Sequence, residues 1–371
     1  MAIAPLENTV SSWLEYSEHE SIRKNIHSKD LHERLFPVFG MTGELGSIAS
    51  VIRKRFRDGE NYKKFKGDLT EELGDLLWYI TIISLNQGIK DLRFPESRKR
   101  CSFERDYLSL VNTCTRIGVL VRNKRRTTKG EKEKLKALVQ TSLDQIAVLG
   151  YGVGVSILDI ANRNLRKSRE FWFRGDFGPA PYFDRDFPEH EQIPRRLDIS
   201  FLSSSSGRNV LLQVNSVNIG DKLSDNAYSD DGYRYHDVFH IANFAVLGWS
   251  PVLRRMLKRK RKSDPVSDEV EDGARAALVE ELVVNKIYDY VRDHDFFAKV
   301  QHVDMTLLKS VTSLVRDFEV KSCSPSEWRM AIRCGCKAFR SLREMDSGVV
   351  SFDADSRSVQ VFKSAPMSSE L

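Results

Sequence analysis

The chain has 371 residues, with 58 Lys and Arg against 52 Asp and Glu, which gives a formal net charge of +6. Hydrophobic residues make up 41% and charged residues 30%, ordinary values for a globular protein. So small a net charge excludes a globally basic nucleic-acid-binding protein. The length exceeds what one small core usually holds, so we expect two domains.

The sequence predicts a cytoplasmic protein without a membrane anchor. No apolar run approaches the roughly 20 residues that cross a bilayer. The N-terminal MAIAPLENTVSSWLEY lacks the basic start and apolar core of a signal peptide. Cys334 and Cys336 lie two apart in a helical pattern, so they do not share a face and do not predict zinc. We expect all five cysteines to be reduced thiols.

The first helical patterns, between Gly40 and Gly88, carry inward acidic residues. Glu44 lies on the first helix, and Glu71, Glu72 and Asp75 lie on the second. Residues three or four apart share one face of a helix, so Asp75 faces the same side as both glutamates. Inward carboxylates are costly without a positive partner, and Mg²⁺ prefers a few carboxylates plus substrate phosphates. The pattern predicts a magnesium site.

An alternative without metal is that Thr70 caps the second helix. Glu71 and Glu72 would then lie near the positive dipole end, and Asp75 would be solvated. For an isolated E-x-x-D motif this interpretation is favoured. Here it is weakened because Glu44 lies one helix earlier in a Gly-Glu-Leu-Gly run flanked by Ile48, Ile52 and Phe56.

The two motifs, Gly43-Glu44-Leu45-Gly46 and Glu71-Glu72-Leu73-Gly74-Asp75-Leu76-Leu77-Trp78-Tyr79, resemble those of MazG, the all-α nucleoside triphosphate pyrophosphohydrolases. The resemblance implies a four-helix catalytic module, usually dimeric, that uses Mg²⁺, with Mn²⁺ as a substitute, to cleave an NTP or dNTP to the monophosphate and pyrophosphate. It implies Glu44, Glu72 and Asp75 as metal ligands, and Glu71 or Glu72 as the catalytic carboxylate. One departure is Ser47, which stands where the family usually has a second glutamate.

The segment Asn162-Arg163-Asn164-Leu165-Arg166-Lys167-Ser168-Arg169 resembles the N-L-x-K segment that closes this module. Asn164 and Lys167 lie three apart, which suits them to hold phosphate or sugar oxygens. The alternative is a basic, solvated helix end. In the basic spacer between the acidic helices we expect Lys54 to contact a triphosphate, while most other cations there are solvated surface.

Composition places the domain boundary near residue 175. Residues 12–172 are predicted to be helical, with 103–121 and 135–173 as helices joined by the basic turn NKRRTTKGEKEK. Residues 174–196 are rich in Pro, Asp and aromatics, which is typical of a linker. We therefore expect an N-terminal domain at 1–175, a linker at 176–196 and a C-terminal domain at 197–371.

The C-terminal domain is predicted to be helical with two short hairpins. The first hairpin pairs 197–202 with 210–214, and the second pairs 349–352 with 358–362. Helices are predicted at 233–257, 272–293 and 326–342. The whole chain is therefore mainly α, an all-α four-helix module followed by an α+β domain.

A second group of polar residues lies in this domain. His236 and His240 are four apart, the spacing that lets two imidazoles share a metal ion. We predict that one pocket is lined by residues of two helices, with three basic residues at its rim: His236, Asp237, His240, Arg275, Glu280 and Glu281, and then Lys260, Arg261 and Lys262.

Simpler interpretations stay open for each part of this group. Paired histidines on an aromatic-lined helix are often core or capping residues, and acidic side chains on a helix are often solvated. The KRKRK run fits a solvated loop, a nucleic-acid patch or a phosphate clamp. Aromatic residues do not interleave it, which disfavours single-strand binding.

The strings DGYRYHDVFHIANFAVLGWSPVLRRMLKRKRKSD and DEVEDGARAALVEEL resemble the C-terminal domain attached to some MazG proteins, over about residues 197–362. That resemblance implies no settled activity.

Taken with the motifs of the first two helices, the resemblance to MazG predicts a magnesium-dependent pyrophosphohydrolase of nucleoside triphosphates. The protein is expected to be a homodimer or higher homo-oligomer, with nucleic acid an improbable partner. The alternative is a catalytically weakened nucleotide sensor or interaction module whose C-terminal domain binds a nucleotide or polyanion.

Overall fold

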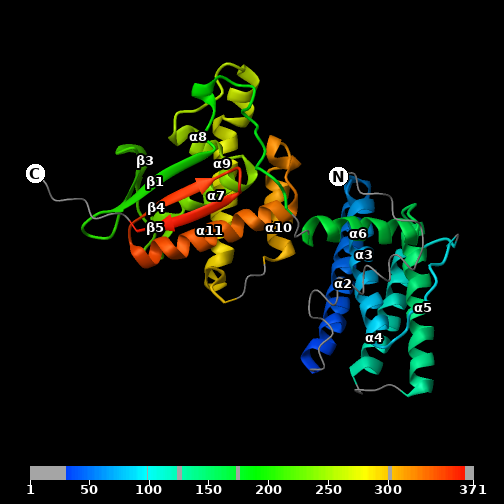
Figure 1. Cartoon of the computed structure of the whole chain (residues 1–371). Coiled ribbons are helices and arrows are strands. Elements are labelled where there is room, and N and C mark those ends of the chain that lie inside the picture. The colour runs from blue at the N-terminus through cyan, green and yellow to red at the C-terminus, as the bar shows by residue number, and fades with distance from the viewer. Residues whose placement is uncertain (1–30, 98, 123–127, 173–175, 300–302, 364–371) are drawn as a thin grey trace, which may run out of the picture. The chain divides into compact units, whose positions relative to one another are not determined.

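The computed structural model divides into two compact units, residues 1–169 and 170–371 (Figure 1). It describes residues 31–97, 99–122, 128–172, 176–299 and 303–363. The helix expected before residue 31, the N-terminal segment tested for a signal peptide, and the first part of the basic turn fall outside these ranges. Helices dominate both units and one small sheet lies in the second, which confirms the predicted mainly α fold.

The first unit is a helical bundle. Its helices are α2 (Leu31–Asp58), α3 (Phe65–Asn86), α4 (Phe103–Arg122), α5 (Lys129–Tyr151) and α6 (Ile157–Trp172), of which the last turn, from Glu170 on, belongs to the second unit. Helix α2 packs on α3 and α4, and α5 packs on the same two helices. The predicted stripe on α3 is buried in this core, with Leu69, Leu73 and Leu77 inaccessible to solvent. The bundle thus forms because each amphipathic helix buries its apolar stripe against two neighbours.

Gly74 explains how α6 reaches the acidic face of α3. A Cβ atom at this position would lie 3.0 Å from the Cβ of Asn164 on α6 and 3.4 Å from the Ile160 carbonyl oxygen. Only glycine allows so close an approach without displacement of a neighbour. The glycine in the Glu-Leu-Gly-Asp motif therefore places α6 beside Asp75.

The stretch Leu35–Asn61, most of α2, is long and apolar enough to cross a membrane by length and composition alone. This qualifies the expectation that no such run exists, although core helices of water-soluble proteins meet the same criterion. Its residues Met41 and Ile48 are buried in the bundle. Phe56, predicted to flank Glu44 on the apolar side, is instead mostly exposed.

The second unit combines a sheet with helices. Its elements are β1 (Arg196–Ser203), β2 (Val210–Val214), β3 (Val217–Leu223), α7 (Asp237–Leu247), α8 (Pro251–Met256), α9 (Ala274–Arg292), α10 (Met305–Leu314), α11 (Pro325–Met345), β4 (Gly348–Asp353) and β5 (Ser358–Phe362). All strand pairs are antiparallel, in the order β3-β2-β1-β4-β5. Both predicted hairpins form, and the pairing of β1 with β4 joins them. Strand β3 and helix α10 were not predicted.

Helix α7 is the centre of this unit. All its residues are buried, and it packs against α11 and against β4 and β5 (Figure 1). The continuous helix predicted over 233–257 is wrong, because α7 ends at Gly248. This residue has φ +67°, and a Cβ there would lie 2.0 Å from the Pro181 carbonyl oxygen. Ser250 then caps α8 by accepting a hydrogen bond from the Leu253 N–H.

The segment 176–196, predicted as a linker, packs onto the second unit. Ala180 and Ile193 are buried in its core. The Asp184 carboxylate accepts hydrogen bonds from the Ile193 N–H and from Arg254, at 2.9 and 2.8 Å. This segment therefore packs against the second unit instead of forming a free linker, because apolar residues between its prolines and acids are buried in the core.

A buried ion pair anchors the connector between α8 and α9. Arg261 is only 1% exposed and donates to both Asp272 and Glu319, at 2.7 and 2.8 Å. The prediction that Arg261 lines the rim of a pocket is therefore wrong. A planar guanidinium can satisfy two carboxylates at once, so it is the cation best suited to such a position.

We predict that Arg261→Met destabilises the second unit by about 3–5 kcal/mol, because it removes the nearest cation of the buried Asp272, which keeps only the 3.5 Å contact with Arg254. Urea denaturation followed by circular dichroism measures this change. The matched control is Lys262→Met at the next, exposed position, which should stay within about 0.5 kcal/mol of the wild type. Equal midpoints for Arg261→Met and Lys262→Met would contradict a structural role.

Candidate functional site

The structure brings the three predicted magnesium ligands together. Glu44 comes from α2, and Glu72 and Asp75 come from one face of α3. One carboxylate oxygen of each lies within 4.8 Å of the other two. The helical spacing aligns the α3 pair, and the packing of α2 on α3 supplies the third carboxylate. A group of hard oxygen ligands at this separation suits Mg²⁺ or Mn²⁺.

The two residues predicted to bind substrate contact this cluster from α6. Asp75 accepts a hydrogen bond from Asn164 Nδ2 at 2.6 Å and forms an ion pair with Lys167 Nζ at 2.5 Å. Lys167 Nζ also lies 3.4 Å from Glu71 Oε1, which places Glu71 at the edge of the cluster. In this arrangement, Asn164 and Lys167 fix the Asp75 carboxylate.

The cluster carries more negative charge than Lys167 offsets. Burial, together with Asp75 and Glu72, raises the pKa of Glu44 to about 8, although Lys167 opposes the shift. Burial and the charges of Glu44 and Asp75 also raise the pKa of Tyr79 to about 12. The sequence analysis missed Tyr79, whose position one turn after Asp75 was the available signal. Because the neighbouring carboxylates raise the pKa of Glu44 despite Lys167, an added cation is favoured at this site.

Other residues of the motif have different places. Lys54 Nζ lies 4.2 Å from the ring centroid of Tyr62, and this exposed lysine makes no ion pair with the cluster in the described part of the chain. Ser47 is half-buried one turn after Glu44. The capping alternative is wrong, because α3 begins at Phe65 and the Thr70 hydroxyl donates to the Lys66 carbonyl oxygen at 2.7 Å.

A second cluster forms at the start of α7. One ligand atom from each of His236, His240 and Glu281 lies within 4.8 Å of the others. His236 Nε2 is 3.2 Å from Asp237 Oδ1. His240 Nδ1 is 3.0 Å from Glu280 Oε1, and its Nε2 is 3.5 Å from Glu281 Oε2. Five of the residues predicted for the second site therefore lie together.

Glu280 is wholly buried and held by three neutral donors. It accepts hydrogen bonds from Ser250 Oγ, the Val252 N–H and Asn243 Nδ2, at 3.0, 2.9 and 3.3 Å. The sequence analysis missed Asn243 and Ser250 as supports of this carboxylate. The available signal was Trp249-Ser250-Pro251, because serine followed by proline is a typical helix start.

Burial and charge act in opposite directions in this cluster. Burial disfavours the imidazolium of His240, but Glu280, Glu281 and Asp237 raise its pKa well above the usual value. Burial raises the pKa of Asp237. Burial also opposes ionisation of Glu281, yet the adjacent His240 lowers the pKa of that carboxyl. The cluster thus gathers carboxylates around two imidazoles in a buried setting.

The predicted basic rim does not form around the second cluster. Lys260 Nζ pairs with Asp268 at 2.6 Å, and Arg261 is bound to Asp272. Lys262 and Arg275 are exposed, and no ion pair joins either to the cluster within the described ranges. The connector between α8 and α9 does not line the second cluster, because Arg261 pairs with Asp272 and Glu319. The sequence pattern did not reveal this pairing.

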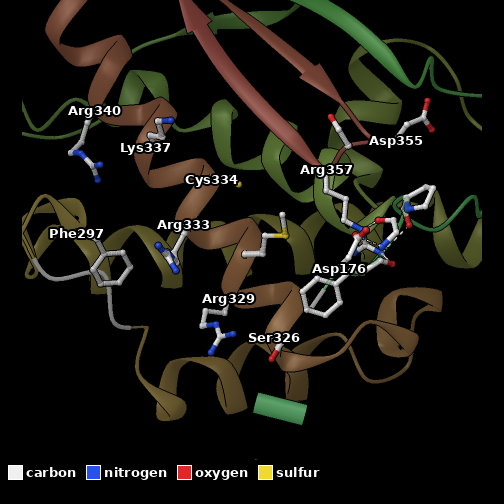
Figure 2. A pocket seen from close by; sticks show the side chains of 15 residues that line it. Asp176, Phe297, Ser326, Arg329, Arg333, Cys334, Lys337, Arg340, Asp355 and Arg357 are labelled. Atoms are coloured by element: carbon white, nitrogen blue, oxygen red, sulfur yellow. Dashed lines mark hydrogen bonds between the residues drawn. The ribbon is translucent and has the colours of Figure 1, made fainter. Parts of the chain in front are cut away.

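A cavity of about 860 Å³ in the second unit is lined by cations of α11. Figure 2 shows four basic residues following this helix at intervals of four, four and three: Arg329, Arg333, Lys337 and Arg340. Arg329 donates to the Phe171 carbonyl oxygen at 2.9 Å, and Arg340 donates to that of Phe296. The sequence analysis missed this pocket, although the helical spacing of the cations was visible in the sequence.

A family comparison identifies the second unit. The model of the MazG C-terminal domain matches residues 178–365, about half of the chain. The chain therefore belongs to the MazG C-terminal domain family, and it is a MazG-like protein with this domain appended. No match was found among curated proteins or among solved structures. The matched range includes the histidine cluster and the α11 cavity, but not the acidic cluster of α2 and α3.

We predict that Mg²⁺ binding is linked to the protonation of Glu44. With a pKa of about 8, Glu44 holds a proton at pH 6.5 that the metal must displace. As the pH rises toward 8, the apparent Kd for Mg²⁺ should therefore fall by up to about tenfold per pH unit. Above pH 8 it should level off. Calorimetry at pH 6.5, 7.5 and 8.5 tests this, with Glu44→Gln expected to remove the pH dependence.

The same shift has a consequence for metal-free stability. The pKa of Glu44 is raised on folding, so its contribution is complete below about pH 4.5 and is lost as the pH rises through about 8. Added Mg²⁺ should therefore raise Tm more at pH 8.5 than at pH 6.5. A Kd and a Tm increment that do not vary with pH would contradict the raised pKa.

Proposed function

We propose that the first unit is a Mg²⁺-dependent nucleoside triphosphate pyrophosphohydrolase, which converts an NTP or dNTP and water to the monophosphate and pyrophosphate. The observation that carries the proposal is the convergence of Glu44, Glu72 and Asp75 within 4.8 Å on two packed helices. The membership of the chain among MazG-like proteins supports it. So does the raised pKa of Glu44, which indicates a site short of positive charge.

In this proposal each side chain has a distinct task. Glu44, Glu72 and Asp75 would hold Mg²⁺, or Mn²⁺ in its place. The chemistry that such an ion would supply is neutralisation of charge on the phosphates and on the leaving pyrophosphate. Glu71 or Glu72 orients the attacking water and accepts its proton. Asn164 and Lys167 fix Asp75, and Lys167 adds a cation next to the cluster that would attract a triphosphate.

The proposal includes a homo-oligomer in the cytoplasm. Phe36 and Phe39, one turn apart on α2, are each more than half exposed and offer apolar side chains that a second copy would cover. The five cysteines are unpaired, in keeping with a reducing compartment. Gel filtration with light scattering measures the number of chains.

We predict that Glu72→Gln or Asp75→Asn lowers Mg²⁺-dependent pyrophosphate release by about 100-fold or more, because each removes an anionic ligand of the metal ion that would neutralise the phosphates. Both changes keep the side-chain volume, so the fold should persist. Glu133→Gln, an equal charge loss at an exposed position of α5, is the control and should keep wild-type rates. Wild-type turnover in the Glu72 and Asp75 variants, with an unchanged circular dichroism spectrum, would refute the metal assignment.

A second candidate function is nucleotide or polyanion sensing without efficient turnover. Two observations favour it: Ser47 takes the place of a carboxylate in the first unit, and the α11 cavity of the second unit presents cations to a ligand. A cavity of this size with basic and aromatic lining accommodates a nucleotide. Binding would then reside in the second unit.

If the second unit is the sensor, Arg333→Glu with Lys337→Glu should weaken ATP binding by at least about tenfold, because two cations of the cavity become anions. Calorimetry measures the Kd for ATP, and all proteins carry Glu72→Gln so that ATP is not turned over during the titration. Arg208→Glu, an exposed arginine between β1 and β2, gives a matched charge change and should leave Kd unaltered. Equal affinity in all three proteins would assign nucleotide binding to the first unit.

A further inference from the structure

We propose that His236, His240 and Glu281, supported by Asp237, form a second metal site that binds a divalent transition-metal ion such as Zn²⁺. This site lies wholly in the second unit and is independent of the pyrophosphohydrolase proposed for the first. It rests on the orientation of the two imidazoles, the burial of His240 and the balance of charge around them.

The orientation of His236 leaves one ring nitrogen for a metal. Its Nδ1 lies 2.8 Å from the Tyr233 carbonyl oxygen, which only accepts, so Nδ1 carries the hydrogen. The ring stacks on Tyr233 at 4.2 Å between centroids with an angle of 7°. Nε2 therefore faces Asp237 Oδ1 at 3.2 Å. A metal-binding histidine is typically held in this way, with its other nitrogen bonded to a backbone carbonyl.

His240 is a fully buried imidazole whose ring nitrogens lie at ion-pair distance from Glu280 and Glu281 without a well-formed hydrogen bond. Its side chain is 0% exposed, and neither ring nitrogen makes a hydrogen bond of acceptable geometry with any described residue. Such a group is costly to bury unless something else satisfies it. The Glu280 carboxylate lies behind Nδ1 at 3.0 Å, itself fixed by Ser250 and Val252, so Nε2 is the atom directed at the site. A carboxylate behind a histidine is the usual support of a metal ligand.

The charges around the two rings also require a cation. Asp237, Glu280 and Glu281 supply three carboxyl groups, and the first two are buried. Among the described residues, the ion-pair partners of these three acids are histidines, with no lysine or arginine within pairing distance. Imidazoles and carboxylates gathered around one point, with Arg255 close enough to act on Glu281 but not paired with it, are an environment that suits a divalent metal.

The ligand types identify the class of metal. Two imidazole nitrogens with carboxylate oxygens suit Zn²⁺ and its first-row neighbours, whereas the all-oxygen cluster of the first unit suits Mg²⁺. The Glu281 side chain is 43% exposed, so one side of the site meets solvent. Three protein ligands with a solvent-facing position are the arrangement of a zinc ion that keeps a bound water.

The test uses the full chain with Glu72→Gln, which removes a ligand of the first site. After chelation, Zn²⁺ is titrated by calorimetry in excess Mg²⁺, and Co²⁺ is titrated by its visible absorption. We expect one equivalent per chain and a rise in Tm on binding. X-ray absorption at the zinc edge should show two imidazole nitrogens. His236→Gln and Glu281→Gln should each weaken Zn²⁺ binding by about 100-fold or more, because each removes a ligand.

Matched controls are His190→Gln and Glu269→Gln, which change an exposed histidine and an exposed carboxylate and should leave the Zn²⁺ affinity unchanged. Circular dichroism establishes that the variants fold. If an imidazolium at His240 alone balances the carboxylates, the protein takes up no equivalent of Zn²⁺ or Co²⁺. That result, or equal Zn²⁺ affinity in the ligand variants and controls, would overturn the proposal.

Discussion

The constraint on which this structure depends is that a buried carboxylate needs a positive partner. The buried Asp272 and Glu280 and the half-buried Asp75 meet it in three ways. Asp272 has the guanidinium of Arg261, Asp75 has the ammonium of Lys167, and Glu280 has the imidazole of His240. In the first case one guanidinium pairs with both Asp272 and Glu319, and its role is structural. In the other two, further carboxylates lie beside the pair, and these are the places where we propose metals.

Both proposed metal sites are built on helices that cannot easily move. Glu72 and Asp75 belong to α3, whose apolar side forms the core of the bundle, and His240 lies on α7, which is buried along its whole length. Ligands fixed by packing keep their separation when the ion leaves, so little conformational entropy is lost on binding. Without an ion, the negative charges of the cluster repel one another, and together with burial this repulsion raises the pKa of Glu44.

The two units offer different chemistry to a nucleotide. The first presents a cluster of carboxylate oxygens beside Lys167, which suits a magnesium-bound triphosphate. The second has two separate features: a cluster of imidazoles and carboxylates on α7 and α9, and a cavity lined by the cations of α11. The membership of the second unit in the MazG C-terminal domain family places both features in the appended domain rather than in the proposed pyrophosphohydrolase. Its ligands can therefore be tested without reference to catalysis.

The sequence by itself determined the features that follow from local periodicity: the faces shared by Glu72 with Asp75 and by His236 with His240, the apolar stripe of α3, and the two hairpins. These depend on backbone geometry within a few residues. Tertiary structure alone decided that α7 stops at Gly248 against Pro181, that Arg261 is buried rather than at a rim, that segment 176–196 covers a core, and that β1 pairs with β4. Each of these depends on which distant surface meets the residue, because burial and charge pairing are set by packing between segments far apart in the chain.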